Sequence, residues 1–146
     1  MYATVLWATD GTARATAALQ RALELLDPTG RLVAAHIDQR FVGSHLHGVP
    51  IYPDEGSRIE RIQAQVEELR EREVDAELIV EPTSGSPVTA LAALAEETGA
   101  DVIVCGARAG HAVLRLIEGS FSSRLVHEAS VPVVVVPVPA RERAAG

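Results

Sequence analysis

The sequence predicts a single doubly wound α/β domain, with a five-stranded parallel sheet in the order 3-2-1-4-5 and helices on both faces. Short apolar runs alternate along the chain with segments that repeat apolar residues at helical spacing. The apolar runs lack in–out alternation, which is typical of strands buried on both faces of a parallel sheet. A length of 146 residues suffices for one such domain and not for two ordinary ones. Right-handed crossovers then leave few topologies.

The strands are predicted where short apolar runs end at turn-forming residues. In chain order they are Val5–Ala8, Leu32–Ile37, Glu77–Val80, Val102–Cys105 and Val131–Val136. A turn is predicted at Asp27–Gly30. Residues 39–53, which contain glycine, proline and histidine, are predicted to form a long irregular segment.

The helices are predicted between these strands. Apolar residues recur at helical spacing over residues 15–26, 59–69, 88–95 and after Ser120. Ser57 and Glu60 have the spacing of a capping box. Ser86 is predicted to cap the third helix, with Pro87 in its first turn. The domain therefore covers residues 1–139, and residues 140–146 are expected to be a flexible tail.

The composition excludes several classes of protein. The net charge of -7 argues against a nucleic-acid surface, because a phosphate backbone would be repelled. All thirteen basic residues are arginine, so a mechanism that needs a lysine is excluded. Cys105 is the single cysteine, which fits a reducing compartment. No signal peptide is seen and no apolar run approaches the roughly 18 residues of a membrane span. A cytoplasmic location is therefore expected.

Two unusual loops are predicted to meet at one edge of the sheet. Strands one and four are neighbours in the predicted order, and ligands of such folds bind beyond the carboxyl ends of the strands at this point. Thr9–Gly11 and Gly106–Gly110 border the crevice. The helix start at Gly119–Ser120 adds backbone N–H groups that suit a phosphate. Asp10 and Ser120 have a second interpretation, as caps of their helices.

Several motifs in order resemble the universal stress protein family over nearly the whole chain. They are VLWATDGTARATAALQRAL, AAHID, GSPVTALAALAEETGADVIVCGARA and EGSFSSRLVHEASVPVVVVP. ATP-binding members carry Gly-x2-Gly-x9-Gly-Ser/Thr, which Gly106, Gly119 and Ser120 match. The second glycine falls on Ala109, and Gly110 follows it. If position 109 needs a positive φ, its Cβ costs about 1 kcal/mol or more; otherwise alanine serves.

The resemblance implies an ATP site in the crevice, with Mg²⁺ held mainly by the phosphates. The nucleoside end falls on Ala8, Thr9, Asp10 and Ile37. The phosphate end falls on Gly106, Arg108, Ala109, Gly110, Gly119, Ser120, Phe121 and Ser122. No catalytic residue and no metal-binding side chain is assigned. His36, Cys105 and Trp7 are interpreted as packed or hydrogen-bonded residues rather than catalytic ones.

Three functions remain open at the level of the sequence. The first is an ATP-binding stress-response regulator or interaction module, and the second is a nucleotide-free dimeric module acting through an unknown protein partner. The third is a slow ATPase, although neither G-x-S-x-G nor G-x-G-x-x-G occurs and no positioned base is evident. A homodimer through Val131–Val136 is expected, because this strand would be an apolar sheet edge, and the family is known for such dimers.

Overall fold

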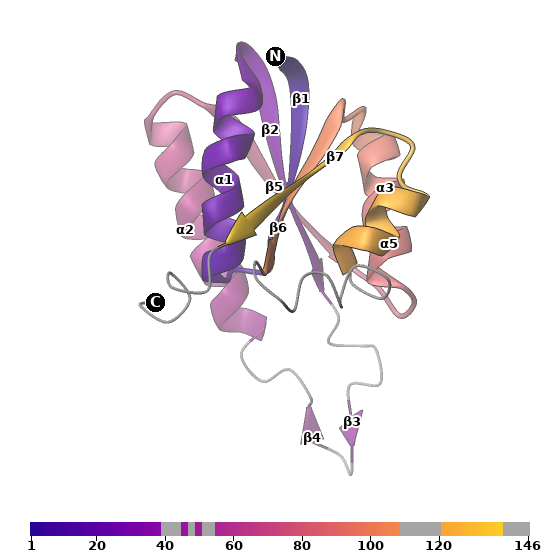
Figure 1. Ribbon diagram of the computed structural model, residues 1–146. Helices are drawn as coiled ribbons and strands as arrows, with labels where there is room; N and C mark the ends of the chain where they lie inside the picture. The colour runs from indigo at the N-terminus through magenta and orange to yellow at the C-terminus, as the bar shows by residue number, and fades with distance from the viewer. Residues whose placement is uncertain (39–44, 47–48, 51–54, 109–120, 139–146) are drawn as a thin grey trace.

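The computed structural model describes residues 1–38, 45–46, 49–50, 55–108 and 121–138. Its main sheet has five parallel strands in the order β5-β2-β1-β6-β7, which confirms the predicted 3-2-1-4-5 topology (Figure 1). The strands are β1 (Tyr2–Ala8), β2 (Leu26–Asp38), β5 (Asp75–Pro82), β6 (Val102–Arg108) and β7 (Val133–Val138). The helices are α1 (Ala13–Leu25), α2 (Glu55–Glu71), α3 (Pro87–Thr98) and α5 (Phe121–Glu128).

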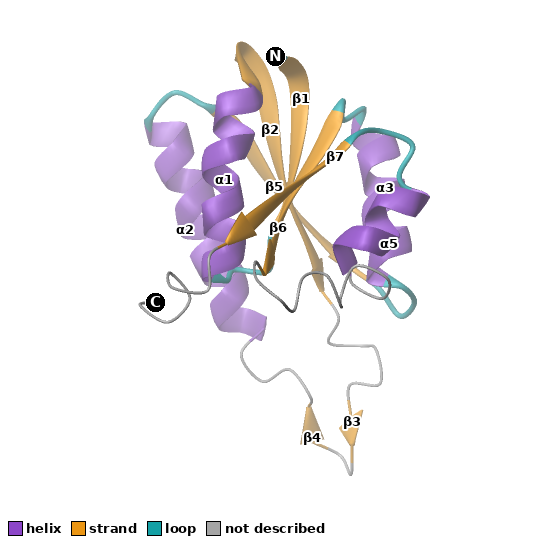
Figure 2. Cartoon of the chain, viewed as in Figure 1, coloured by secondary structure: helices purple, strands orange, loops and turns teal. Residues whose placement is uncertain are grey.

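Helices cover both faces of this sheet, as predicted. Helices α1 and α2 lie against one face, and α3 and α5 lie against the other (Figure 2). Alternate side chains of β1 divide between the two cores, because successive residues of a strand point to opposite faces. Trp7 packs in the core with α1 and α2, and Leu6 packs in the core with α3 and α5. Aliphatic side chains fill the rest of both cores.

Most strand boundaries differ from the prediction, and two of these differences have a cause in the local chemistry. Strand β7 begins at Val133 rather than Val131, directly after Pro132, whose nitrogen has no hydrogen to donate. Strand β2 begins at Leu26, which pairs with Tyr2, and the regular register resumes only at Arg31. The intervening residues 27–30 form an irregularity in which the Asp27 carboxylate accepts from the Thr29 N–H at 2.9 Å.

The segment between β2 and α2 also differs from the prediction. It contains two short antiparallel strands, β3 (His45–Leu46) and β4 (Val49–Pro50), within a stretch predicted to be irregular. Helix α2 begins at Glu55, so Ser57 lies inside it and the predicted capping box is wrong.

Helix α3 has the caps that its sequence predicts. The Ser86 side chain accepts a hydrogen bond from the Thr89 N–H at 3.3 Å, and Pro87 occupies the first turn. Gly99 follows the last turn with φ 69°, and its N–H points back to Ala95 and Glu96. A left-handed residue at this position satisfies carbonyl groups at the end of the helix. These caps fix where the chain turns into β6.

Some predictions fall outside the described part of the chain. These are the tail at 140–146, the Ser120 cap, and positions 109, 110 and 119. Within the described part, no helix combines the length and the apolar character that a bilayer crossing requires.

Candidate functional site

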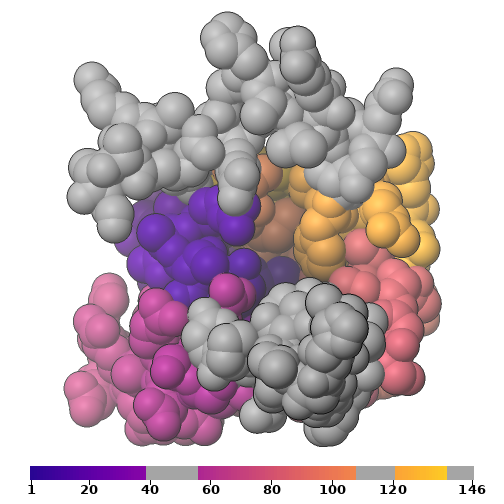
Figure 3. All heavy atoms as spheres, turned by 90° about the horizontal axis from the view of Figure 1, so that it is seen from below, coloured from indigo at the N-terminus to yellow at the C-terminus, as the bar shows by residue number. Residues whose placement is uncertain are grey.

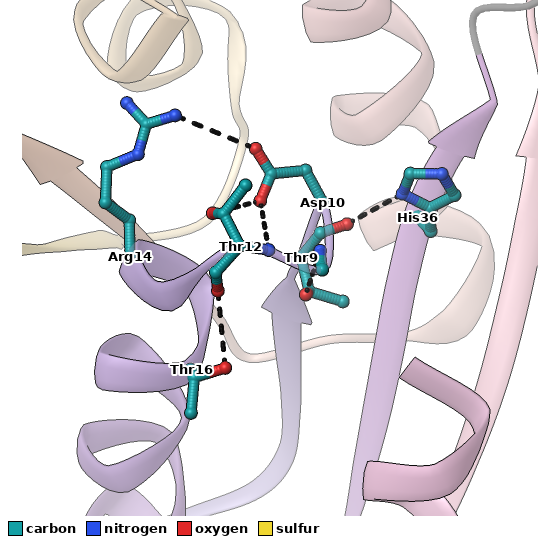
Figure 4. Close-up of polar contacts among 7 residues, drawn as sticks. Thr9, Asp10, Thr12, Arg14, Thr16 and His36 are labelled. Atoms are coloured by element: carbon teal, nitrogen blue, oxygen red, sulfur yellow. Dashed lines mark hydrogen bonds and ion pairs between the residues drawn. The ribbon is translucent and has the colours of Figure 1, made fainter. Parts of the chain in front are cut away.

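The turn after β1 is held by its own polar groups (Figure 4). The Thr9 N–H donates to the Ala35 carbonyl at 2.9 Å, and the Thr9 hydroxyl accepts from the Gly11 N–H at 3.1 Å. Gly11 has φ 78°, the left-handed region that favours glycine. Asp10 Oδ1 accepts from the Thr12 N–H at 3.0 Å and from the Thr12 hydroxyl. The sequence thus orders this turn before any ligand is present.

Asp10 supports the start of α1 without being its N-cap. Thr12 occupies the N-cap position, and its side chain makes no capping bond to the helix. The second Asp10 oxygen, Oδ2, lies 3.9 Å from Arg14 Nη2, which is too long for a hydrogen bond. The Asp10 side chain is 44% exposed. Its carboxylate therefore orders the turn with one oxygen, while the other forms a long ion pair with Arg14.

His36 ties β2 to the same turn. The ring is buried, and its Nδ1 lies 2.9 Å from the Thr9 carbonyl oxygen. Because a carbonyl only accepts, Nδ1 must carry the hydrogen. The interpretation of His36 as a hydrogen-bonded, packed residue is confirmed. Its bond holds the Thr9 carbonyl on the β2 side of the turn (Figure 4).

Gly106 brings β6 close to the first turn of α1. A Cβ at this position would lie 2.4 Å from the Arg14 carbonyl oxygen and 2.9 Å from the Arg14 carbonyl carbon. Both atoms belong to the backbone, so no side-chain rotation relieves the overlap. The first glycine of the family motif is therefore required here by helix–strand packing alone.

A cavity of about 290 Å³ lies at the carboxyl ends of β1 and β6. These are the strands between which the winding of the sheet reverses. Figure 3 views this end, where the indigo N-terminal segment meets orange β6 and yellow α5. The described lining comprises Ala8, Thr9, Asp10, Thr12, Arg14, Ala15, Ala35, His36, Ile37, Arg58, Pro87, Leu91, Cys105, Gly106 and Phe121.

Half of the residues proposed from the sequence line this cavity. They are Ala8, Thr9, Asp10, Ile37, Gly106 and Phe121. Ser122 lies in the first turn of α5 but is not part of the described lining. Arg108 ends β6, and Ala109, Gly110, Gly119 and Ser120 lie outside the described residues. The binding roles assigned to all twelve residues stay predictions.

Sequence reasoning missed the other lining residues. Arg14 lies four positions after Asp10 in the chain, and this spacing was the available signal for it. Arg58 and Leu91 had no such signal, because tertiary packing alone brings α2 and α3 to the cavity. Cys105 lines the cavity from β6 as a buried residue.

The chemistry of the lining does not favour covalent catalysis. Burial raises the pKa of the Cys105 thiol to about 11, so the thiol is protonated near neutral pH and is a weak nucleophile. Among the described residues, no cluster of three or more histidine, cysteine, aspartate or glutamate side chains is placed to hold a metal ion. Apolar walls and a charged rim instead suit a non-covalently bound organic ligand.

A doubly wound sheet with a cavity at the point of reversal defines a class of α/β proteins that bind ligands beyond the carboxyl ends of their strands. Within this class, the model of the Universal stress protein family matches residues 1–137. The chain belongs to this family. Among curated proteins, none matches it closely enough to count as a relative.

Solved structures of universal stress proteins share the fold. A universal stress protein in complex with cAMP is 24% identical, with a TM-score of 0.61 over 92% of this chain and 97% of the other. A family protein from Burkholderia pseudomallei is 24% identical, with a TM-score of 0.64 over 94% and 97%. A family protein from Arabidopsis thaliana with AMP bound is 15% identical, with a TM-score of 0.64 over 95% and 93%.

Proposed function

We propose that this protein binds an adenine nucleotide, ATP first of all, in the cavity beyond β1 and β6. The bound nucleotide would bias its shape and partners, so that it acts as a stress-response regulator or interaction module. The observation that carries the proposal is the cavity of about 290 Å³ at the reversal point of a universal stress protein fold. Similar proteins have been solved with cAMP and with AMP. This supports an adenine nucleotide over other ligands.

The nucleoside would occupy the apolar part of the cavity. Ile37 and Leu91 are buried, and Phe121 is 41% exposed at the beginning of α5. Such surfaces suit a planar base, and backbone groups at the end of β2 would read its edge. Asp10 Oδ2, which faces away from the Thr12 bonds, would accept hydrogen bonds from the ribose hydroxyls (Figure 4).

The triphosphate would extend toward the end of β6. The family motif assigns this region to the chain around Gly106 and to Gly119–Ser120, whose N–H groups suit phosphate. Mg²⁺ would be bound mainly by the phosphate oxygens. Asp10 is the one carboxylate in the described lining, which fits a metal ion that arrives with the nucleotide.

Calorimetric titration with Mg-ATP tests the proposal. Asp10→Asn should weaken ATP binding by about tenfold, because a charged acceptor is lost. Asp27→Asn is a matched control, because Asp27 also accepts from the N–H and hydroxyl of a threonine two positions later, away from the cavity. If the wild-type protein binds no ATP at millimolar concentration, the proposal is wrong.

A nucleotide-free interaction module is the second candidate, and Ala109 favours it. The methyl group stands where ATP-binding relatives have glycine. If this second function is correct, the purified protein should contain no nucleotide and titration should detect no ATP binding. Acid extraction followed by chromatography detects a retained nucleotide directly, and its presence would count against the second candidate.

We also propose a homodimer through the β7 edge. Among the described strands, β7 is terminal in the sheet and pairs with β6 alone. Residues Val133 to Val136 are each only partly buried. An apolar strand with unpaired backbone groups is prone to pair with another strand. A second copy related by a two-fold axis would cover it.

A further inference from the structure

Two arginines from different helices line the cavity together with Asp10. Arg14 lies in the first turn of α1, and Arg58 lies in α2. Among the described lining residues, these two guanidinium groups outnumber the one carboxylate. The chain as a whole carries a net charge of -7. Both guanidinium groups of the described lining therefore come from the side of the cavity that α1 and α2 form.

The placement of Arg58 depends on Gly11. A Cβ on Gly11 would lie 3.1 to 3.3 Å from the O, Cβ and Cα atoms of Arg58. Because Gly11 has no side chain, the beginning of α2 packs directly on the turn that contains Asp10. Arg58 is half-buried at this contact and is one of the residues that line the cavity.

Arg14 forms only a long ion pair with the Asp10 carboxylate. Its Nη2 lies 3.9 Å from Asp10 Oδ2, and the other Asp10 oxygen is occupied by Thr12. The first turn of α1 contains no acidic residue. A cation in a first helical turn is opposed by the helix dipole, unless an anion lies beside it. The Arg14 side chain is two-thirds buried at the cavity, where the Asp10 carboxylate at 3.9 Å offsets this cost only in part.

We propose that Arg14 and Arg58 form a phosphate-binding pair on the α1 and α2 side of the cavity. The inference rests on the proposed function and adds a selectivity to it: the pair makes the site prefer phosphorylated nucleosides over the nucleoside itself. Guanidinium groups suit this role, because they stay charged and bind phosphate oxygens with two parallel N–H groups.

Titration of wild-type and variant proteins with adenosine, AMP and ATP tests this inference. Arg14→Gln and Arg58→Gln should each weaken AMP and ATP binding by about tenfold and leave adenosine binding unchanged. Arg14→Lys should recover part of the loss, because it keeps the charge but not the planar fork. Matched controls are Arg21→Gln on α1 and Arg61→Gln on α2, two exposed arginines away from the cavity lining. They change the net charge equally and should bind all three ligands as the wild type does.

The outcomes separate this inference from the proposed function. If the wild type binds AMP and ATP but both cavity variants bind them equally well, the phosphate-binding pair is wrong and the nucleotide site stands. If the variants lose adenosine as strongly as ATP, the arginines hold the shape of the cavity and the selectivity is wrong. If the wild type binds none of the three ligands, the proposed function and this inference both fail.

Discussion

Replacing Gly106 with alanine tests the close approach of β6 to α1. The new Cβ would lie 2.4 Å from the Arg14 carbonyl oxygen, roughly 1 Å inside ordinary contact. The two nearest atoms belong to the Arg14 backbone, so the first turn of α1 must move away from the sheet. Overpacking of this kind costs about 3 kcal/mol of unfolding free energy. For a domain of this size the midpoint of thermal unfolding should fall by roughly 6–12 °C.

Circular dichroism of nucleotide-free protein, with urea and with heat, measures this loss. Nucleotide is left out so that the measured loss of stability reports packing and not the loss of a ligand. Gly85→Ala is the matched control: nothing lies within 4 Å of the added carbon, and its φ is not positive. Its stability should change by less than about 1 kcal/mol. If Gly106→Ala unfolds at the wild-type midpoint, the packing account of the first motif glycine is refuted.

Two further predictions concern pH and assembly. Burial raises the pKa of the Cys105 thiol from its ordinary value of 9.0 to about 11, so the folded protein holds this proton more tightly. The resulting stability is fully present below pH 9.0 and is lost as pH rises toward 11; urea unfolding should show this decline, and Cys105→Ala should reduce it. Light scattering at micromolar concentration should give about twice the 15.5 kDa mass of the chain, and a monomer would contradict pairing through β7.

The fold was predictable because its signals are local and repeated. Apolar runs such as Val102–Cys105 mark strands covered on both faces, and the pair Ser86–Pro87 marks a helix start. The errors lie where one local feature competes with another. Residues 27–30 have the sequence of a turn and were predicted to form one. In the structure they form an irregularity within β2, because Leu26 before them already pairs with Tyr2.

The candidate site was predictable only in part. Asp10 and Gly106 come just after apolar runs that predict strands, so the predicted sheet order places them at the same edge. Arg58 reaches the cavity because Gly11 admits the beginning of α2, and no pattern around Arg58 signals this contact. Site residues that reach the cavity through packing between helices can be identified only from the tertiary structure. Site residues near strand ends can be predicted from the strand order alone.

The hydrogen bond between Trp7 and α1 gives the protein a built-in optical reporter. Trp7 is the only tryptophan, it is fully buried, and its Nε1–H donates to the Ala15 carbonyl at 2.8 Å. Ala15 lines the cavity one residue after Arg14. Any ligand that shifts the beginning of α1 will change the polarity and bonding around the indole. The intrinsic fluorescence of unlabelled protein therefore follows events in the cavity as they occur.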